Sequence, residues 1–372
     1  MTSAMASMQV VFRTDASIQI GNGHVMRCLS LAAGLAEEGA HVQFLCRADD
    51  GNLIDLIAQH QFIVHSLPTG GTVKSQDEPG LPNHSDWLGC DWQTDVQHCR
   101  DIISDPVDWI IVDHYALDHR WETAIRDKCC CIMCIDDLAN RVHDCEVLLD
   151  QNLGRTADDY RDFLTKETRM LLGPQYALLR PEFARWRETS LARRQNPELC
   201  HILVTMGGVD RNNLTGRALR ALKQCQRDTL ERITVVLGPH APWRDQVIAL
   251  AEEMPVNTTV LSAVDNMAEL MTSCDLAIGA SGGTTWERCY LGVPSVMSVL
   301  ADNQKNIAKY MLQANAAYII EDMRAFETRL LTFLEKRELL DLMRTFSIAS
   351  AQLFYANGVG ETISELGTIC GK

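Results

Sequence analysis

The chain has 372 residues, with 49 acidic against 34 basic side chains and a formal net charge of −15. A hydrophobic fraction of 46% excludes global disorder, and the acidic balance argues against unspecific binding to nucleic acid or to an anionic membrane surface. No stretch approaches the roughly 18 apolar residues of a membrane span, and the first residues lack the basic and apolar regions of a secretory signal. We therefore expect a cytoplasmic globular protein of two domains, with neither nucleic acid nor membrane as a partner.

Short apolar runs alternate with helical patterns in both halves of the chain. In the first half, strands are predicted at residues 9–13, 41–46, 62–67, 108–113, 130–136, 146–150 and 169–173. In the second half, they are predicted at residues 201–206, 232–238, 258–262, 275–279, 293–299 and 316–320. The clearest helices are expected at residues 24–38, which Gly39 ends, and at 214–224 and 303–313. Continuous apolar strands joined by helices are typical of parallel sheets covered on both faces, so the sequence predicts an α/β fold with two Rossmann-like, doubly wound sheets.

The domain boundaries follow from the composition. The polar, arginine-rich residues 185–198 predict a linker, so we expect one domain at 8–184 and a second at 198–345. Residues 324–366 are expected to form one long helical stretch, and residues 346–372 to pack back on the first domain. Because ligands of doubly wound sheets bind beyond the carboxyl ends of the strands, the cleft between the domains is the expected site. Residues 69–90 are interpreted as a surface loop rather than a lid.

The fourteen cysteines raise the question of a metal site. Cys129, Cys130, Cys131 and Cys134 cluster, but a structural zinc site usually needs a second pair of ligands at matching spacing. The nearest candidates are His143 and Cys145, which form a single His-x-Cys. We therefore expect no metal, and buried thiols in a reducing compartment.

The strongest candidate for chemistry is His24. The first predicted strand runs through Arg13 and Asp15 into Ile20-Gly21-Asn22-Gly23-His24, where a helix begins. The spacing G-x-G-H is not the G-x-G-x-x-G dinucleotide fingerprint, which argues against a dehydrogenase. A neutral imidazole at a strand end can accept a proton, although a single histidine is more often structural. Asp15 or Asp113 could orient its ring.

Two glycine loops of the second half are suited to phosphate. Met206-Gly207-Gly208-Val209-Asp210 follows the first strand of that half, and Gly279-Ala280-Ser281-Gly282-Gly283 joins a later strand to a helix that carries Glu287. Small residues with free N–H groups fit phosphate oxygens, and a glutamate one turn further on can accept hydrogen bonds from a ribose. The alternative for Glu287 is a favourable charge at a helix start.

These motifs resemble two related groups of enzymes. AIGASGGTTWERCYLGVPSV (277–296), followed by Asp302-Asn303-Gln304, resembles the donor-binding region of GT-B nucleotide-sugar glycosyltransferases, above all the peptidoglycan N-acetylglucosaminyltransferase. FRTDASIQIGNGHVMRCLSLA (12–32), IIVDHYALD (110–118), LLDQN (148–152), GPQYALLRPEF (173–183) and MGGVDRNNLT (206–215) together resemble the UDP-2,4-diacetamido-2,4,6-trideoxy-β-L-altropyranose hydrolases of pseudaminic acid biosynthesis. The second resemblance spans nearly the whole chain.

The resemblance implies a GT-B-like fold and hydrolysis of a UDP-sugar, with water attacking the anomeric carbon and inversion. His24 would be the general base. The protein would be a monomer that uses neither a metal nor a cofactor. The implied substrate-binding residues are Arg13, Asp15, Gly21, Gly23, Tyr115, Asn152, Arg180, Asn303 and Gln304. The implied UDP-binding residues are Gly207, Gly208, Val264, Ser281, Gly282 and Glu287. The alternatives are a glycosyltransferase of the same fold and a nucleotide-sugar binding protein without turnover.

Overall fold

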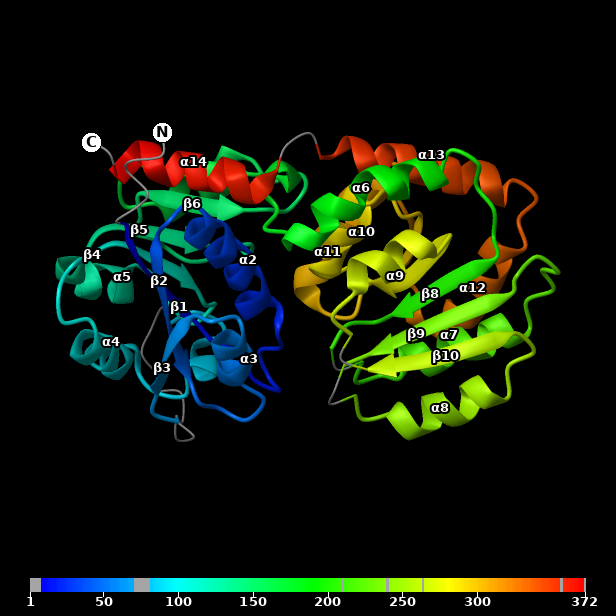
Figure 1. Cartoon of the computed structure of the whole chain (residues 1–372), viewed down its shortest axis with the longest axis horizontal. Helices are drawn as coiled ribbons and strands as arrows, with labels where there is room; N and C mark the ends of the chain where they lie inside the picture. The colour runs from blue at the N-terminus through cyan, green and yellow to red at the C-terminus, as the bar shows by residue number, and fades with distance from the viewer. Residues whose placement is uncertain are drawn as a thin grey trace. The chain divides into compact units, whose positions relative to one another are not determined.

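The computed structural model of the chain describes residues 8–69, 81–208, 210–238, 241–262, 264–354 and 357–370 (Figure 1). The chain divides into two compact units. The first comprises the residues up to Leu179 together with those from Ala356 on, and the second comprises Arg180–Tyr355.

The first unit is built on a seven-stranded sheet with the order β3-β2-β1-β4-β5-β6-β7, in which all neighbours are parallel. Its strands are β1 (Gln9–Thr14), β2 (His41–Arg47), β3 (Ile63–Leu67), β4 (Val107–Asp113), β5 (Cys129–Ile135), β6 (Val147–Asp150) and β7 (Arg169–Leu172). Its α-helices are α2 (Gly23–Glu37), α3 (Ile54–Gln59), α4 (Trp92–Ile102), α5 (His119–Ile125) and α14 (Gly358–Cys370). Short 3₁₀ turns are η1 (Ser85–Leu88), η2 (Arg126–Lys128), η3 (Ala157–Phe163) and η4 (Pro174–Tyr176).

Strand side chains alternate between two helical layers. On β1, Val10 and Phe12 pack in the core that also contains residues of α2, α3 and α14, whereas Val11 packs with α4 and α5. The C-terminal helix α14 packs against α2 (Figure 1). Both faces of the sheet are therefore covered, which explains why its strands appear in the sequence as continuous apolar runs.

The second unit repeats this architecture with a six-stranded parallel sheet of order β10-β9-β8-β11-β12-β13. Its strands are β8 (His201–Thr205), β9 (Arg232–Leu237), β10 (Asn257–Ser262), β11 (Leu276–Ala280), β12 (Ser295–Ser298) and β13 (Tyr318–Ile320). Its α-helices are α6 (Pro181–Arg193), α7 (Leu214–Lys223), α8 (Arg244–Glu252), α9 (Met267–Ser273), α10 (Thr284–Tyr290), α11 (Lys305–Gln313), α12 (Phe326–Leu334) and α13 (Leu339–Gln352), with 3₁₀ turns η5 (Asp302–Gln304) and η6 (Met323–Ala325).

The predicted strands are confirmed, but two predictions about the connections are wrong. Most of the expected linker at 185–198 lies in α6, which begins at Pro181 and buries Phe183 and Ser190 on one face. The expected long helical stretch is broken into α12, α13 and α14, and these are shared between the units. The boundaries expected at residues 184 and 345 thus fall inside α6 and α13.

Two further sequence expectations concern loops and membranes. Residues 70–80 of the expected surface loop at 69–90 lie outside the described residues. None of the helices in the described ranges combines the length and hydropathy that a bilayer crossing needs.

Candidate functional site

His24 lies in the first turn of α2, just beyond the carboxyl end of β1. Gly21 has a φ of +81°, and no atom lies within 4 Å of a Cβ built on Gly21 or Gly23. The backbone beside the imidazole is therefore open to a ligand. The His24 side chain is 8% exposed, so it is largely buried but remains accessible from the surface.

Asp113, the last residue of β4, fixes the orientation of the His24 ring. Its Oδ1 lies 2.6 Å from His24 Nδ1. Arg27 donates to the same carboxylate, from Nε to Oδ2 at 2.6 Å and from Nη2 to Oδ1 at 2.7 Å. Burial alone would raise the pKa of Asp113, but the charge of Arg27 and the contacts with Arg27 and His24 outweigh burial and lower that pKa well below its usual value. The carboxylate therefore stays ionised.

An ionised carboxylate can only accept hydrogen bonds, which assigns the tautomer of His24. Nδ1 carries the hydrogen, and in the neutral ring the lone pair lies on Nε2. The hydrogen-bond contacts of the His24 ring with the described residues are at Nδ1, which leaves Nε2 to face a ligand. A ring held in this way can take a proton from a water molecule.

Strand alternation explains why Asp113, and not Asp15, meets His24. On β4, Trp109 and Ile111 face the layer that contains α2, and Asp113, two residues further on, faces the same layer. On β1, Val11 faces the opposite layer, and so does Asp15.

Arg13 and Asp15 accordingly lie in the opposite layer, in a buried network. Arg13 donates to Asp95 of α4 at 3.0 and 2.7 Å, and its Nη1 lies 2.7 Å from Asp15 Oδ1. Asp15 also accepts the backbone N–H of Arg47 at 2.6 Å and lies 3.3 Å from His114 Nε2. Arg13 and Asp15 are 0% and 1% exposed. Their charges neutralise one another inside the fold, and their predicted contacts with substrate stay predictions.

Tyr115 lies edge-on against His24, with ring centroids 4.5 Å apart. Its hydroxyl donates to Asp137 Oδ1, while Arg27 Nη1 donates to Asp137 Oδ2 at 2.9 Å. Arg27 thus joins the two carboxylates that hold His24 and Tyr115. Neither Arg27 nor Asp137 is among the predicted site residues, although Asp137 closely follows the carboxyl end of β5, where ligands of such sheets bind.

Asn152 follows β6 at the same edge of the sheet and is 7% exposed. Its backbone N–H donates to Asp150 Oδ1 at 2.9 Å. Burial, with a contribution from Asp137, raises the pKa of Asp150 to about 7. The predicted contact of Asn152 with substrate stays a prediction.

In the second unit, the loop after β8 is open at its glycines. Gly207 has a φ of +91°, and no atom lies within 4 Å of a Cβ built on Gly207 or Gly208. A Cβ on Gly238, which follows β9, would lie only 1.8 Å from the carbonyl oxygen of Gly208. The backbone that follows these two neighbouring strands is thus in close contact at Gly208 and Gly238, and the loop after β8 leaves its backbone uncovered at Gly207 and Gly208, as a phosphate site requires.

Ser281, Gly282 and Gln304 lie at the same edge of this sheet. Ser281 is fully buried, and its Oγ has no partner among the described residues. Gln304 accepts the backbone N–H of Leu300 at 2.9 Å, and its Nε2 lies 3.6 Å from a Cβ built on Gly282. Gly282 and Gln304 are thus brought together, whereas the side chain of Asn303 lies outside what the structure describes.

Glu287 lies in α10, and 17% of its side chain is exposed. Arg180 Nη2 lies 3.4 Å from Glu287 Oε1. Burial raises the pKa of Glu287 although Arg180 opposes the shift. Val264 is partly buried and packs against the core that contains Ala268 and Met271. The predicted roles of these residues toward UDP and substrate stay predictions.

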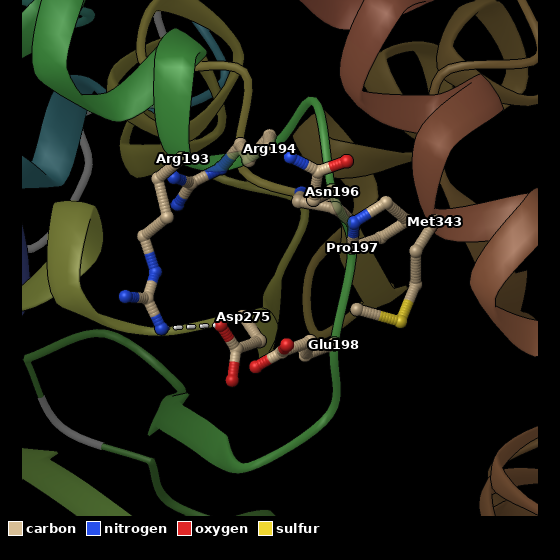
Figure 2. A pocket seen from close by; sticks show the side chains of 8 residues that line it. Arg193, Arg194, Asn196, Pro197, Glu198, Asp275 and Met343 are labelled. Atoms are coloured by element: carbon tan, nitrogen blue, oxygen red, sulfur yellow. Dashed lines mark hydrogen bonds and ion pairs between the residues drawn. The ribbon is translucent and has the colours of Figure 1, made fainter.

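A cavity of about 150 Å³ in the second unit lies at the opposite, amino-terminal edge of the sheet (Figure 2). Its lining includes Asp275, which directly precedes β11 and pairs with Arg193 at 2.6 Å. Arg194, also in the lining, donates to the carbonyl oxygen of Met271 near the end of α9 at 2.8 Å. Because ligands of doubly wound sheets bind at the carboxyl ends of the strands, this cavity is not our candidate site.

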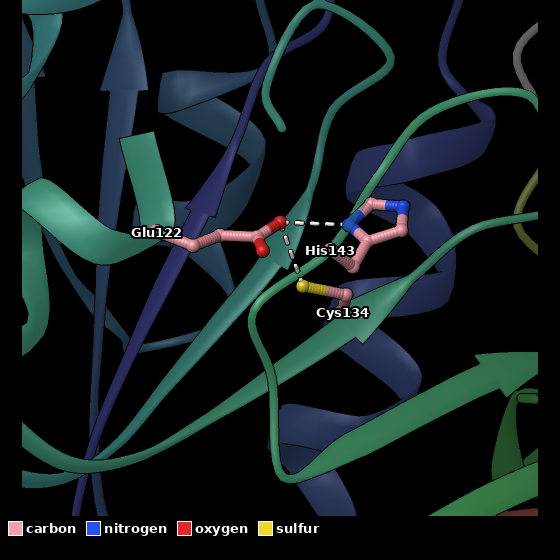
Figure 3. Close-up of side chains that lie close together, drawn as sticks. All are labelled: Glu122, Cys134 and His143. Atoms are coloured by element: carbon pink, nitrogen blue, oxygen red, sulfur yellow. Dashed lines mark hydrogen bonds and ion pairs between the residues drawn. The ribbon is translucent and has the colours of Figure 1, made fainter. Parts of the chain in front are cut away.

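Glu122, Cys134 and His143 offer ligand atoms that lie within 4.8 Å of one another in the core of the first unit (Figure 3). Glu122 Oε1 lies 2.7 Å from His143 Nδ1 and accepts from Cys134 Sγ at 3.1 Å. Burial opposes the positive charge of His143, but Glu122 and Asp136 raise its pKa to about 10. These contacts are those of a buried ion pair, in which one carboxylate holds both His143 and Cys134. The cysteines whose side chains are described are all free thiols.

Comparison with known proteins decides the fold. Residues 201–351 match the glycosyltransferase family 28 C-terminal domain. The crystal structure of MurG from Acinetobacter baumannii is similar with a TM-score of 0.66, covering 97% of this chain and 99% of that chain at 17% sequence identity. The chain has a GT-B-like fold. The predicted fold class is therefore confirmed.

Two sequence relatives add to this GT-B-like assignment. An uncharacterized protein of Methanocaldococcus jannaschii is 28% identical over 78% of this chain and 55% of its own length. The UDP-2,4-diacetamido-2,4,6-trideoxy-β-L-altropyranose hydrolase of Campylobacter jejuni is 27% identical over 56% of this chain and 63% of its own length. The chain thus matches little more than half the length of these relatives. Together, the similarities relate the GT-B-like chain to enzymes of nucleotide-sugar chemistry.

Proposed function

We propose that the chain hydrolyses a UDP-linked 2,4-diacetamido-2,4,6-trideoxy hexose to UDP and the free sugar, as a cytoplasmic step of pseudaminic acid biosynthesis. The observation that carries the proposal is the 2.6 Å hydrogen bond from His24 to Asp113, which leaves Nε2 as the basic atom of the ring. The similarity to the Campylobacter jejuni hydrolase supports the choice of reaction.

In the proposed mechanism, His24 Nε2 removes a proton from water as the water oxygen bonds to the anomeric carbon. The bond between that carbon and the diphosphate oxygen breaks, so that UDP leaves and the configuration inverts. A terminal phosphate with a pKa of about 6 can depart without a protein acid, which is why one base suffices. A general base of this kind typically contributes about 10²–10⁴-fold to the rate.

We assign UDP to the second unit. Backbone N–H groups at Gly207, Gly208 and Gly282 would bind the diphosphate, and Glu287 would accept hydrogen bonds from the ribose. The uncovered backbone at these glycines supports the assignment. Val264 would meet uracil, and Tyr115, Asn303 and Gln304 would contact the sugar.

The second candidate function is sugar transfer from the same donor. The match of residues 201–351 to a glycosyltransferase domain favours it. In that case His24 Nε2 would deprotonate an acceptor hydroxyl instead of water.

Incubation of the purified protein with the UDP-sugar alone separates the two functions. If the protein is a hydrolase, chromatography should find UDP and free sugar released in equal amounts. A transferase would release UDP only after an acceptor is added. The His24→Asn variant should bind UDP but lose most turnover. Turnover by this variant at the wild-type rate would remove His24 from the mechanism.

A further inference from the structure

Two aromatic rings with no role in the proposed proton transfer lie beside His24. The His84 and Trp87 rings are 4.3 Å apart, and they lie 5.6 and 5.8 Å from the ring of Tyr115. Tyr115 in turn meets His24 edge-on at 4.5 Å. Tyr115 is only 6% exposed, whereas His84 and Trp87 are partly exposed. The three rings therefore form a continuous aromatic surface that reaches from the imidazole to solvent.

The position of this aromatic surface is fixed by its own turn. Trp87 belongs to η1, whose last residue, Leu88, is 1% exposed and anchors the turn in the core. Gly89 ends the turn with a φ of +70°. Gln19 donates from Nε2 to Asp86 Oδ2 at 3.1 Å, which ties the turn to the loop that leads into His24.

The rings present an uncharged surface. Burial outweighs the opposing charge of Asp86 and, with smaller contributions from Arg141 and His24, lowers the pKa of His84, which favours its neutral imidazole. The guanidinium of Arg141 lies 5.7 Å from the centre of the Tyr115 ring, and it is paired with Asp136 at 2.6 Å. Arg27, which also lies near Tyr115, is paired with Asp113 and Asp137. Both guanidinium groups are thus bound to carboxylates, and neither is free to recruit a phosphate to these rings.

Such a surface fits the apolar groups of a sugar. A 2,4-diacetamido-2,4,6-trideoxy hexose carries three methyl groups, at C6 and on the two acetamido substituents, whereas an ordinary hexose has a hydroxymethyl group at C6. Aromatic side chains bind apolar groups well, and ligand pockets combine them with a few polar groups that fix orientation.

We propose that His84, Trp87 and Tyr115 form a sugar-binding wall that recognises the methyl groups of a deoxy, N-acetylated hexose beside His24. The inference rests on the proposed function, because it requires the sugar to lie at this imidazole. His84 and Trp87 then select the substrate without taking part in the chemistry.

The test measures binding rather than turnover, by calorimetry in a His24→Gln parent that does not consume the ligand. The ligands are UDP, the UDP-linked trideoxy sugar and UDP-N-acetylglucosamine. Loss of one apolar contact changes the discrimination between two ligands that differ by an apolar group by about 10- to 200-fold. Trp87→Ala should weaken binding of the trideoxy sugar nucleotide within this range and leave UDP binding unchanged. Trp87→Phe should restore much of the affinity.

Phe62→Ala is the matched control. Phe62 is also a partly buried aromatic residue of the first unit, but it directly precedes β3 at the amino-terminal edge of the sheet and packs against Phe44. This variant should bind all three ligands as the parent does. If Trp87→Ala does not fold, His84→Ala replaces it with the same expectation.

The outcomes separate the two proposals. A parent that binds neither UDP nor the trideoxy sugar nucleotide overturns the proposed function, and the wall with it. A parent that binds the trideoxy compound no better than UDP-N-acetylglucosamine, or a folded Trp87→Ala variant with unchanged affinity, overturns the wall alone.

Discussion

The Asp113→Asn substitution tests how the proposed base is held. The carboxylate of Asp113 accepts hydrogen bonds from His24 Nδ1 at 2.6 Å and from two nitrogen atoms of Arg27. In the variant, the amide oxygen is expected to turn toward Arg27, so that the amide nitrogen faces the ring and donates to Nδ1. The hydrogen of the neutral ring then moves to Nε2, which can no longer accept a proton.

The expected loss follows from what a general base contributes. Turnover should fall by about 10²–10⁴-fold, which corresponds to roughly 2.7–5.4 kcal/mol of transition-state stabilisation. The affinity for UDP should be unchanged, because no UDP ligand is assigned to this part of the chain. Removal of one partner of a buried ion pair also costs about 3–5 kcal/mol in the free energy of unfolding, so activity must be expressed per folded molecule.

Asp95→Asn is the matched control for this loss of stability. Asp95 is equally buried and pairs with Arg13, but it lies on α4, in the layer opposite His24, and has no predicted contact with substrate. The assay is UDP release at saturating substrate, with the folded fraction measured by circular dichroism. We expect Asp95→Asn to lower the unfolding temperature and to keep wild-type kcat. A folded Asp113→Asn protein with wild-type kcat would refute the orienting role of Asp113.

Three further outcomes follow from the same structure. Gly208→Ala should leave the unfolding temperature unchanged, since nothing lies within 4 Å of the added Cβ. If the loop binds phosphate, the variant should bind UDP about 10-fold more weakly or worse in calorimetry. Glu287→Gln should weaken the binding of UDP by a similar factor of about 10, because the lost contact is to the ribose. It should weaken the binding of 2′-deoxy-UDP much less, and equal losses for the two nucleotides would contradict the assignment. His143 has a raised pKa of about 10, so its contribution to stability is complete below the unfolded value of about 6.5 and disappears as the pH rises through 10. Urea unfolding should therefore show that the free energy of unfolding of the wild type falls over this pH interval. The Glu122→Gln variant should show a weaker dependence on pH.

The strands could be predicted from the sequence because each is buried on both faces. A strand such as β1 or β8 must then be apolar throughout, and short apolar runs between helices are distinctive. The helix α6 was missed for the opposite reason. It is rich in arginine and buries only a narrow face around Phe183 and Ser190, so its composition is similar to that of a linker.

The site could be predicted only in part. The G-x-G-H motif placed His24 at the end of β1, but the choice between Asp15 and Asp113 was left open. Strand alternation separates them only once the layers are known: Val11 and Ile111 lie in opposite layers, but both strands are apolar on both faces, so the sequence does not mark the layer. The pairing of Arg27 with Asp113 and Asp137 joins α2 to residues at the ends of β4 and β5, and such contacts depend on tertiary packing that motif spacing does not contain.

A single turnover in water enriched in ¹⁸O shows which atom the attacking water bonds to. Mass spectrometry should find one ¹⁸O in the released sugar and none in UDP, because activated water bonds to the anomeric carbon. Label in the UDP phosphate instead would mean that water attacks phosphorus, and would rule out the proposed role of His24.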